Sequence, residues 1–277
     1  MDRRRLRGFC IGLLLVLAAA PFAAAQFTAE AVADRAKWED FLATAEVVGQ
    51  EQMSSRRAVT SPWILTLKKG DVTHRALWKN PEGRMGGFIE GWRFEIAAYR
   101  IDKLLELDMV PPTVERRFRE NRGSCQLWVD DCLSLKDKEE KNIRQPSIKN
   151  IPLNRATYLQ RMLDNLIANE DRHKGNILYT PDWRMVLIDH SRSFRTGSLF
   201  TKKLLNSANS PGAPKLMSEL PRTILEKVKG LTAEKVKEAV GDYLNEKEVE
   251  ALLMRRDLIL VEVERLVKLN GEENVLY

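Results

Sequence analysis

Histidine and cysteine are scarce in this chain, with three of each among 277 residues. His173 and His190 occur within one short stretch, but no cysteine and no third histidine lies nearby. Because zinc sites are usually built from three or four such ligands, the sequence argues against a zinc centre there. Cys10 precedes an N-terminal apolar run, so Cys125 and Cys132 are the pair available for a disulfide. That bridge requires the chain to reverse between them, and two buried thiols are the alternative.

Net charge is also low once the N-terminus is set aside. The formal charge is +6, and Asp2–Arg7 supplies +3 of it through four arginines and one aspartate. The remaining +3 is too small to favour nucleic acid, and no basic stripe carries the interleaved aromatic residues of such proteins. Neither internal repeats nor low-complexity tracts occur. A nucleic-acid partner is therefore not expected.

The apolar run Phe9–Ala20 is too short for a comfortable transmembrane helix. It follows the basic segment and precedes Ala23-Ala24-Ala25, a small-residue pattern typical of signal-peptide cleavage. We therefore expect residues 1–25 to be a signal peptide, with export of the remainder to the periplasm or the outside. An uncleaved anchor is the alternative, and it would also place the domain outside. No membrane span is expected after cleavage.

The rest of the chain has strands first and helices later. Strands are predicted at 58–67, 72–79, 113–118 and 124–129, and helices at 27–47 and 88–107. A polar loop at 135–152 is predicted to precede a helix at 153–168, a hairpin of 176–179 and 185–188, and helices from 202 to a last one at 246–269. This order indicates an α+β fold. We expect two lobes, a strand-rich N-lobe over 26–133 and a helical C-lobe over 134–277.

A lysine and a glutamate in the first half form one candidate pair. Lys79 ends a predicted strand, and Glu95 lies in the following predicted helix. The helix positions Phe88, Trp92, Glu95 and Tyr99 are four, three and four residues apart, so they share a face. A strand lysine held by a helix glutamate positions the α- and β-phosphates of a nucleotide. The alternative is that both charges are exposed to solvent.

Three polar residues in the second half complete the pattern. Asp171 follows an apolar helix, Asn176 begins a short predicted strand, and Asp189 ends the next one. One carboxylate suits a base that accepts a hydroxyl proton, while an amide oxygen and a second carboxylate suit Mg²⁺ or Mn²⁺. The alternative is a helix-end salt bridge in which Arg172 and His173 act as capping partners.

The segments DRHKGN and LIDHSRSF resemble the catalytic and metal-binding segments of the phosphatidylinositol 3/4-kinase-like branch of the protein-kinase-like superfamily. In that branch Asp-Arg-His replaces the usual His-Arg-Asp order. The segments also resemble those of secreted Fam20-type and HipA-like kinases. The resemblance runs from about Ala58 to Phe194, and its specific part is the catalytic segment. It implies a two-lobed protein-kinase-like fold.

The resemblance also implies roles for single residues. Lys79 matches the phosphate-binding lysine and Glu95 its helix partner. Asp171 matches the catalytic aspartate, and Asn176 and Asp189 match the two metal ligands. Cofactor contacts are further implied at the adenine-binding hinge and in the phosphate-covering loop, namely at Gln126, Trp128, Val129 and Thr60.

The chain departs from the family pattern in two places. The loop Met53–Pro62, in the phosphate-covering position, has no glycine, so it would contact phosphate through Ser54, Ser55, Thr60 or its arginines. His190-Ser191 also replaces the Phe-Gly of ordinary kinases.

These patterns predict a monomeric enzyme that transfers a phosphoryl group from ATP or another nucleotide, with Mg²⁺ or Mn²⁺. The acceptor is a hydroxyl of a protein, a lipid or a small molecule, and the sequence does not choose among them. Two alternatives stay open. One is a catalytically silent kinase-like protein that binds nucleotide or serves as a scaffold. The other is an enzyme of the same fold that transfers AMP.

Overall fold

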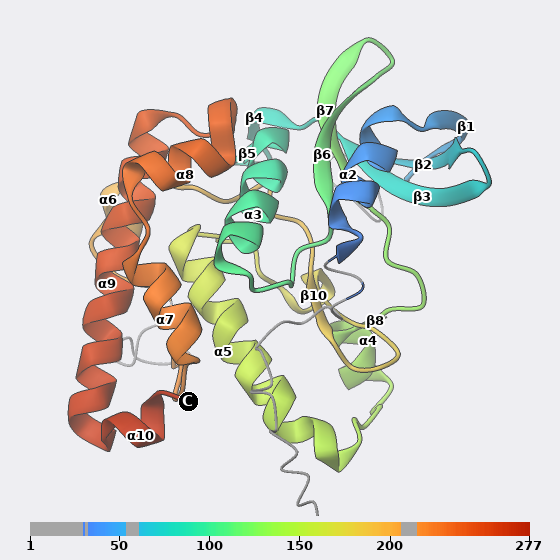
Figure 1. Ribbon diagram of the computed structural model, residues 1–277. Helices are drawn as coiled ribbons and strands as arrows, with labels where there is room; N and C mark the ends of the chain where they lie inside the picture. The colour runs from blue at the N-terminus through green and yellow to red at the C-terminus, as the bar shows by residue number, and fades with distance from the viewer. Residues whose placement is uncertain (1–29, 31–32, 54–60, 206–214) are drawn as a thin grey trace, which may run out of the picture.

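A five-stranded antiparallel sheet forms the N-terminal part of the molecule, and helices dominate the C-terminal part (Figure 1). The computed structural model describes Glu30 and residues 33–53, 61–205 and 215–277. The predicted signal peptide and most of the predicted phosphate-covering loop, with Thr60, lie outside the described residues.

The sheet has the strand order β1-β2-β3-β7-β6. Its strands are β1 (Glu46–Gln52), β2 (Trp63–Lys69), β3 (Val72–Lys79), β6 (Thr113–Phe118) and β7 (Asn121–Leu127). Alternate residues of β2 and β3, such as Leu65 and Trp78, are buried with Phe41 and Leu42 of helix α2 (Arg35–Thr44). The predicted helix 27–47 was too long, because the chain is already extended in β1 from Glu46.

The chain between the sheet and the next helix forms a hairpin that the sequence did not predict. Strands β4 (Glu82–Met85) and β5 (Phe88–Gly91) pair with each other, and helix α3 (Trp92–Leu105) begins only after them. Gly86 and Gly87 have φ of 55° and 89°, a left-handed turn that suits glycine. The expectation that Phe88 shares a helical face with Glu95 is therefore wrong.

The C-terminal part contains a small sheet of order β10-β9-β8 and a set of helices. Its elements are β8 (Leu133–Ser134), α4 (Leu135–Glu140), α5 (Asn150–Leu166), β9 (Ile177–Tyr179), β10 (Met185–Leu187), α6 (Ser198–Thr201), α7 (Arg222–Lys229), α8 (Ala233–Val240), α9 (Glu246–Asn270) and α10 (Glu272–Val275). The short 3₁₀ helices η1 (Ser147–Lys149), η2 (Lys174–Asn176) and η3 (Gly241–Tyr243) connect them. The predicted loop at 135–152 contains α4, because the Ser134 side chain accepts a hydrogen bond from the Asp137 amide and caps this helix.

Helix α3 lies between the sheet and the C-terminal helices (Figure 1). Its buried residues Phe94, Tyr99 and Ile101 belong to the same apolar core as residues of α5 and α9. Arg93 of α3 also donates two hydrogen bonds, of 2.7 and 2.6 Å, to the Glu248 carboxylate at the start of α9. Packing and this ion pair fix α3, and therefore Glu95, against the helical part.

Both cysteines of the described chain are free thiols, so the disulfide alternative is not realised. Cys125 is buried in β7, and burial raises the pKa of its thiol to about 12. Cys132 is partly buried, and burial raises the pKa of its thiol to about 11. Neither thiol is therefore an activated nucleophile near neutral pH.

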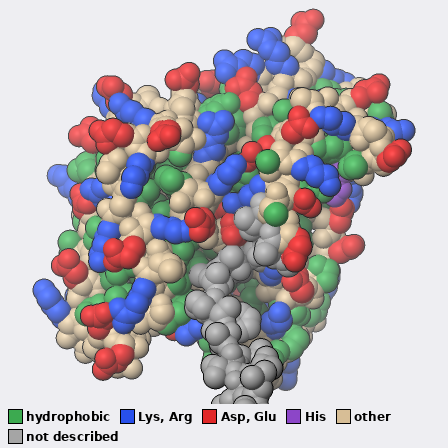
Figure 2. All heavy atoms as spheres, viewed as in Figure 1, with side chains coloured by type: hydrophobic (Ala, Val, Ile, Leu, Met, Phe, Trp, Pro, Cys, Tyr) green, Lys and Arg blue, Asp and Glu red, His purple; other side chains and the backbone are tan. Residues whose placement is uncertain are grey.

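Charges of both signs are interspersed over the face of the molecule in Figure 2. Lys and Arg side chains there lie close to Asp and Glu side chains, over helices and sheet alike. Among the helices that the structure describes, none combines the length and the hydropathy that crossing a bilayer requires.

A buried charge cluster joins α2 to α3. The Arg35 guanidinium lies 3.4 Å from the Asp102 carboxylate and 2.8 Å from that of Asp108. Asp102 is fully buried, and its Oδ1 accepts a hydrogen bond of 3.0 Å from the Met109 amide. Burial raises the pKa of Asp102 to about 7, since it outweighs the opposing effects of the amide and of Arg35.

The Asp102 carboxyl is expected to make stability depend on pH. Its pKa rises from 3.8 in the unfolded chain to about 7 in the fold, so the folded state binds more protons between these values. Its contribution to the free energy of unfolding therefore falls as pH rises through this window. Asp102→Asn should flatten the curve of unfolding free energy, measured by urea denaturation at several pH values. Asp131→Asn, at an exposed turn, is the control, and equal slopes for wild type and Asp102→Asn would contradict the expectation.

Candidate nucleotide and phosphoryl-transfer site

Lys79 ends β3 with its side chain buried among charges. Its Nζ pairs with Glu95 Oε1 and lies 2.7 Å from Asp189 Oδ1. The ion pair that the sequence predicted between Lys79 and Glu95 is thus confirmed. Burial would lower the pKa of Lys79, but the two carboxylates outweigh burial and raise that pKa above its usual range. The lysine is therefore a permanent cation.

A glycine in the neighbouring strand allows the backbone of Lys79 to pack closely. A Cβ atom at Gly123 of β7 would lie 2.7 Å from the Lys79 carbonyl oxygen and 2.7 Å from the Trp78 ring. Such approaches are closer than van der Waals contact allows, so a larger residue here would displace the end of β3. Ser124, the next residue, pairs with Lys79 in the register of the sheet.

Glu95 connects the lysine to the segment after β10. Its Oε2 accepts a hydrogen bond of 3.0 Å from the His190 backbone amide. Burial would raise the pKa of Glu95, but the Lys79 ammonium outweighs it and lowers that pKa. One buried carboxylate thus fixes the strand lysine on one side and the Asp189–His190 segment on the other.

Asp189 adopts a left-handed backbone conformation, with φ of 61°. This conformation is uncommon outside glycine and is found at functional sites. Its Oδ1 takes part in the Lys79 pair and lies 3.2 Å from Ser191 Oγ, while its side chain stays 40% exposed. Burial would raise the pKa of Asp189, but Lys79 outweighs it and holds that pKa well below its usual range. The carboxylate is therefore charged and partly open.

Asn176 lies at the end of η2 with its side chain buried. Its Nδ2 donates to the Asp171 carbonyl oxygen at 3.2 Å, which leaves its amide oxygen as an acceptor. Its own carbonyl accepts from the Ile188 amide at 3.2 Å, so the residue before Asp189 is bonded to Asn176. An amide oxygen and a charged carboxylate brought together by this hairpin suit a hard cation such as Mg²⁺ or Mn²⁺.

A zinc site is not supported. Over the described residues, no three or more His, Cys, Asp or Glu residues gather in a way that could hold a metal. His190 is fully buried, and its Nε2 lies 2.8 Å from an Arg172 nitrogen. His173 instead uses Nδ1 to accept a hydrogen bond from the Gly175 amide at 3.0 Å.

Asp171 lies on the loop after α5. Its amide donates to Asn169 Oδ1 at 3.0 Å, and its side chain is 32% exposed. Arg192 Nη1 lies 3.4 Å from Asp171 Oδ2. Burial raises the pKa of Asp171, the Asp189 charge adds to this, and Arg192 opposes it. Asp171 is thus a partly exposed carboxylate joined through Asn176 to the other candidate residues.

Arg172 organises this loop from inside the protein. It donates two hydrogen bonds, of 3.0 and 3.1 Å, to the Asp164 carboxylate of α5. It also donates to the carbonyl oxygens of Asn176 at 2.8 Å and Ile188 at 2.7 Å. The remaining contact is with His190 Nε2, so one guanidinium joins α5, the Asp171 loop and the Asp189 segment. The sequence suggested an acidic partner for Arg172 but did not identify it.

His190 connects this guanidinium to the helix glutamate. Its Nε2 faces Arg172, and its Nδ1 lies 3.6 Å from Glu95 Oε2. Burial lowers the pKa of the imidazole, and Arg172 lowers it further against the opposing effect of Glu95. A neutral histidine therefore lies between the two charged partners. The sequence showed that His190 replaces phenylalanine, but not this role.

The residues predicted to form the adenine-binding hinge, Gln126, Trp128 and Val129, make contacts other than those of the Lys79 cluster. Gln126 Nε2 donates to Thr113 Oγ1 at 2.9 Å. The Trp128 amide donates to the Arg75 carbonyl at 3.1 Å, and its carbonyl oxygen lies 2.9 Å from His74 Nε2. The backbone groups of Trp128 are thus used within the sheet. Val129 is partly exposed.

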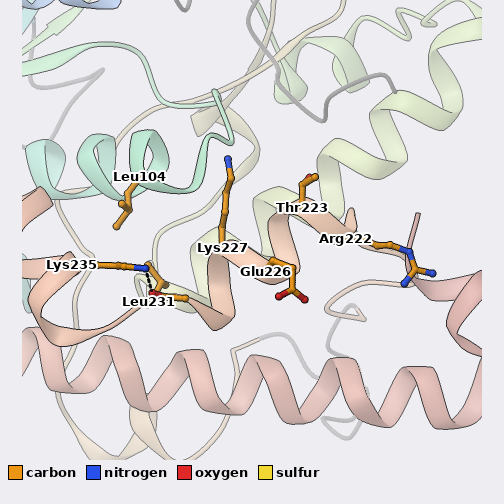
Figure 3. Close-up of a pocket in the computed structure, with 8 residues that line it drawn as sticks. Leu104, Arg222, Thr223, Glu226, Lys227, Leu231 and Lys235 are labelled. Atoms are coloured by element: carbon orange, nitrogen blue, oxygen red, sulfur yellow. Dashed lines mark hydrogen bonds between the residues drawn. The ribbon is translucent and has the colours of Figure 1, made fainter. Parts of the chain in front are cut away.

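A hollow of about 590 Å³ lies elsewhere, beside the end of α3 and the helices α7 and α8 (Figure 3). It shares no residue with the cluster around Lys79 and Asp171. Its cations are engaged, since Lys227 pairs with Glu106, Arg222 pairs with Glu272, and Lys235 donates to the Gly230 carbonyl. Two of these three cations are thus paired with carboxylates, and the hollow lies apart from the residues that the sequence predicted.

The solved structures similar to this chain include kinases. Hydra Fam20, in a structure with sugar, matches with a TM-score of 0.61 and 15% identity over 88% of this chain and 92% of its own. A Golgi casein kinase with Mn and ADP bound matches with a TM-score of 0.59 and 15% identity over 87% of this chain and 78% of its own. The Helicobacter pylori proinflammatory kinase CtkA matches with a TM-score of 0.52 and 13% identity, over 83% and 98%. No family model and no curated protein sequence matches the chain. The α+β kinase-like fold predicted from the sequence is thus confirmed.

Proposed function

We propose that this protein is an ATP- and metal-dependent phosphotransferase that acts on a hydroxyl group. The observation that carries the proposal is the contact of Lys79 with both Glu95 and Asp189, which joins the sheet, α3 and the segment after β10. A lysine, its helix glutamate and a metal-binding aspartate are the parts that hold nucleotide phosphates in kinases. The kinase-like fold and the Mn and ADP in one similar structure support this interpretation.

The reaction we propose begins at Asp171. Its carboxylate accepts the proton of the acceptor hydroxyl while the acceptor oxygen forms a bond to the γ-phosphorus. The bond from that phosphorus to the β,γ-bridging oxygen breaks, and ADP departs with the electron pair. Lys79 binds the α- and β-phosphates, and Glu95 holds the lysine in place.

Asn176 and Asp189 are the residues that would hold the metal. Their amide oxygen and partly exposed carboxylate fit Mg²⁺ or Mn²⁺. When bound, the ion would neutralise charge on the phosphates.

We also propose that residues 1–25 act as a signal peptide and that the acceptor lies in the periplasm or outside the cell. The basic segment, the short apolar run and the three alanines support this. Monomeric behaviour is proposed as well, and gel filtration of the mature protein tests it.

The decisive experiment incubates purified mature protein with γ-labelled ATP, Mg²⁺ or Mn²⁺, and an envelope extract. Transfer of the γ-label to an acceptor supports the proposal. Tight nucleotide binding without transfer to any acceptor would instead support the silent binder. Transfer of label only from α-labelled ATP, with an AMP-sized mass increase, would support AMP transfer.

Asp189→Asn is expected to abolish Mg²⁺-dependent nucleotide binding while the protein stays folded. The change removes a ligand charge but no core volume, and asparagine tolerates the left-handed backbone of this position. Calorimetric titration of ADP with and without Mg²⁺ measures the effect, and a melting curve checks the fold. Asp131→Asn, also at a left-handed position, is the matched control. Unchanged metal-dependent affinity in Asp189→Asn would show that this residue is not a ligand.

A further inference from the structure

A guanidinium lies against the carboxylate that we propose as the base. Arg192 Nη1 is 3.4 Å from Asp171 Oδ2, and the arginine side chain is only 15% exposed. Within the described chain this Nη1 pairs with the Asp171 carboxylate, while the other two guanidinium nitrogens donate to Glu90. The Nη1 edge therefore faces the point where the acceptor hydroxyl would arrive.

The opposite edge of this guanidinium is fixed by the β4–β5 hairpin. Arg192 Nε and Nη2 donate to Glu90 Oε1 at 2.9 and 2.8 Å, and Glu90 is 3% exposed. The guanidinium also stacks on the Phe88 ring, 4.3 Å from its centroid. Ser191 Oγ donates to the other oxygen of Glu90 at 3.0 Å. A buried carboxylate and an aromatic ring thus hold the arginine in one orientation.

The other cations near the Asp171 loop already have partners within the protein. Lys174 is exposed and pairs with Glu139 of α4. The donors of Arg172 are used inside the protein by its contacts with Asp164, two backbone carbonyls and His190. Lys79 is held at the far side of the cluster by its two carboxylates. Arg192 is thus the cation available beside Asp171 among the residues that the structure describes.

We propose that Arg192 binds the γ-phosphoryl group and stabilises its charge during transfer, a role that rests on the proposed function. The attacking oxygen must lie within about 3 Å of the base and about 3–3.5 Å from the phosphorus. An Nη1 atom at 3.4 Å from Asp171 can therefore reach an oxygen of the transferring group. A guanidinium in that position neutralises the charge that develops on these oxygens, as arginine fingers do. Glu90 and Phe88 position it in advance, so no reorganisation is needed at the moment of transfer.

The test compares affinity for ADP with affinity for an imido analogue of ATP, both with Mg²⁺, by calorimetry. Arg192→Gln is expected to weaken binding of the analogue roughly tenfold or more, because a charge-assisted contact to the γ-phosphate is lost. Its affinity for ADP, which lacks that phosphate, should stay within about twofold of wild type. In the γ-label assay, kcat should fall more than KM rises.

Arg195→Gln is the matched control. Arg195 joins the same segment to the same hairpin by donating to the Ile89 carbonyl at 2.5 Å, and it pairs with Glu170 rather than Asp171. If Arg192 only fastened the hairpin, both variants would lose analogue binding equally. We expect the loss only in Arg192→Gln, with both melting temperatures lowered.

The role of Arg192 would be overturned if Arg192→Gln kept the wild-type preference for the ATP analogue over ADP, or if Arg192→Gln and Arg195→Gln lost that preference equally. Either result leaves the proposed function standing if wild type still binds Mg²⁺ and nucleotide and transfers the label. Absence of nucleotide binding by wild type would overturn both proposals together.

Discussion

Asp171→Ala should reduce phosphoryl transfer by about 10²–10⁴-fold, the loss expected when a positioned base is removed. Nucleotide affinity should hardly change, because the Asp171 carboxylate contacts Arg192 and not the Lys79–Asp189 pair. Single-turnover measurement of γ-label transfer, together with calorimetric titration of ADP and Mg²⁺, separates the two effects.

Asp171→Asn is the sharper form of the same experiment. It keeps the side-chain volume and the backbone hydrogen bond to Asn169, so a loss of transfer cannot come from a collapsed loop. It also keeps an oxygen that can accept a hydrogen bond from Arg192, although the negative charge of the carboxylate is lost. Transfer at the wild-type rate in either variant would mean that another group accepts the proton, and the mechanism would fail at its central residue.

Local patterns in the sequence were sufficient to predict the bounds of two strands of the sheet, one of which carries Lys79. Strand β3 has the predicted bounds, Val72–Lys79, because its end and its turn are marked by alternation and by Gly70-Asp71. Strand β6 also has the predicted bounds, after the Pro111-Pro112 stop. The predicted hairpin is present, but β9 begins at Ile177, after Asn176, and β10 ends at Leu187, two residues before Asp189.

The helix before Glu95 shows where periodicity misleads. Phe88 lies four residues before Trp92, a helical step, yet it belongs to β5. The two glycines that were expected to open a helix instead turn the chain between two strands. A four-residue strand next to a helix gives too few residues to reveal its own period.

Contacts between distant segments could not be predicted from one sequence. Glu90 and Arg192 are 102 residues apart, and Arg93 and Glu248 are 155 apart. No period or turn signal links residues at such separations, because the fold alone brings them together. The burial of Asp164 could likewise not be predicted from the sequence, because charged residues are usually exposed.

Arg172→Ala is expected to damage both stability and function. It leaves the buried Asp164 carboxylate without its ion-pair partner, and breaking such a pair costs about 3–5 kcal/mol of unfolding free energy. It also removes the hydrogen bonds from Arg172 to the carbonyl groups of Asn176 and Ile188, which fix the hairpin that we propose to bind the metal. Urea denaturation measures the first effect, and titration of Mg²⁺ with ADP measures the second.

A double variant, Arg172→Met with Asp164→Leu, separates the two contributions. Replacing both members of a buried pair by apolar residues removes the isolated charge, so most of the lost unfolding free energy should return. Transfer and metal-dependent binding should stay low, because methionine cannot donate to the two carbonyls or to His190. If the double variant regains both stability and transfer, Arg172 is only half of a helix-end salt bridge. If stability returns without transfer, its hydrogen bonds to the loop are what the site requires.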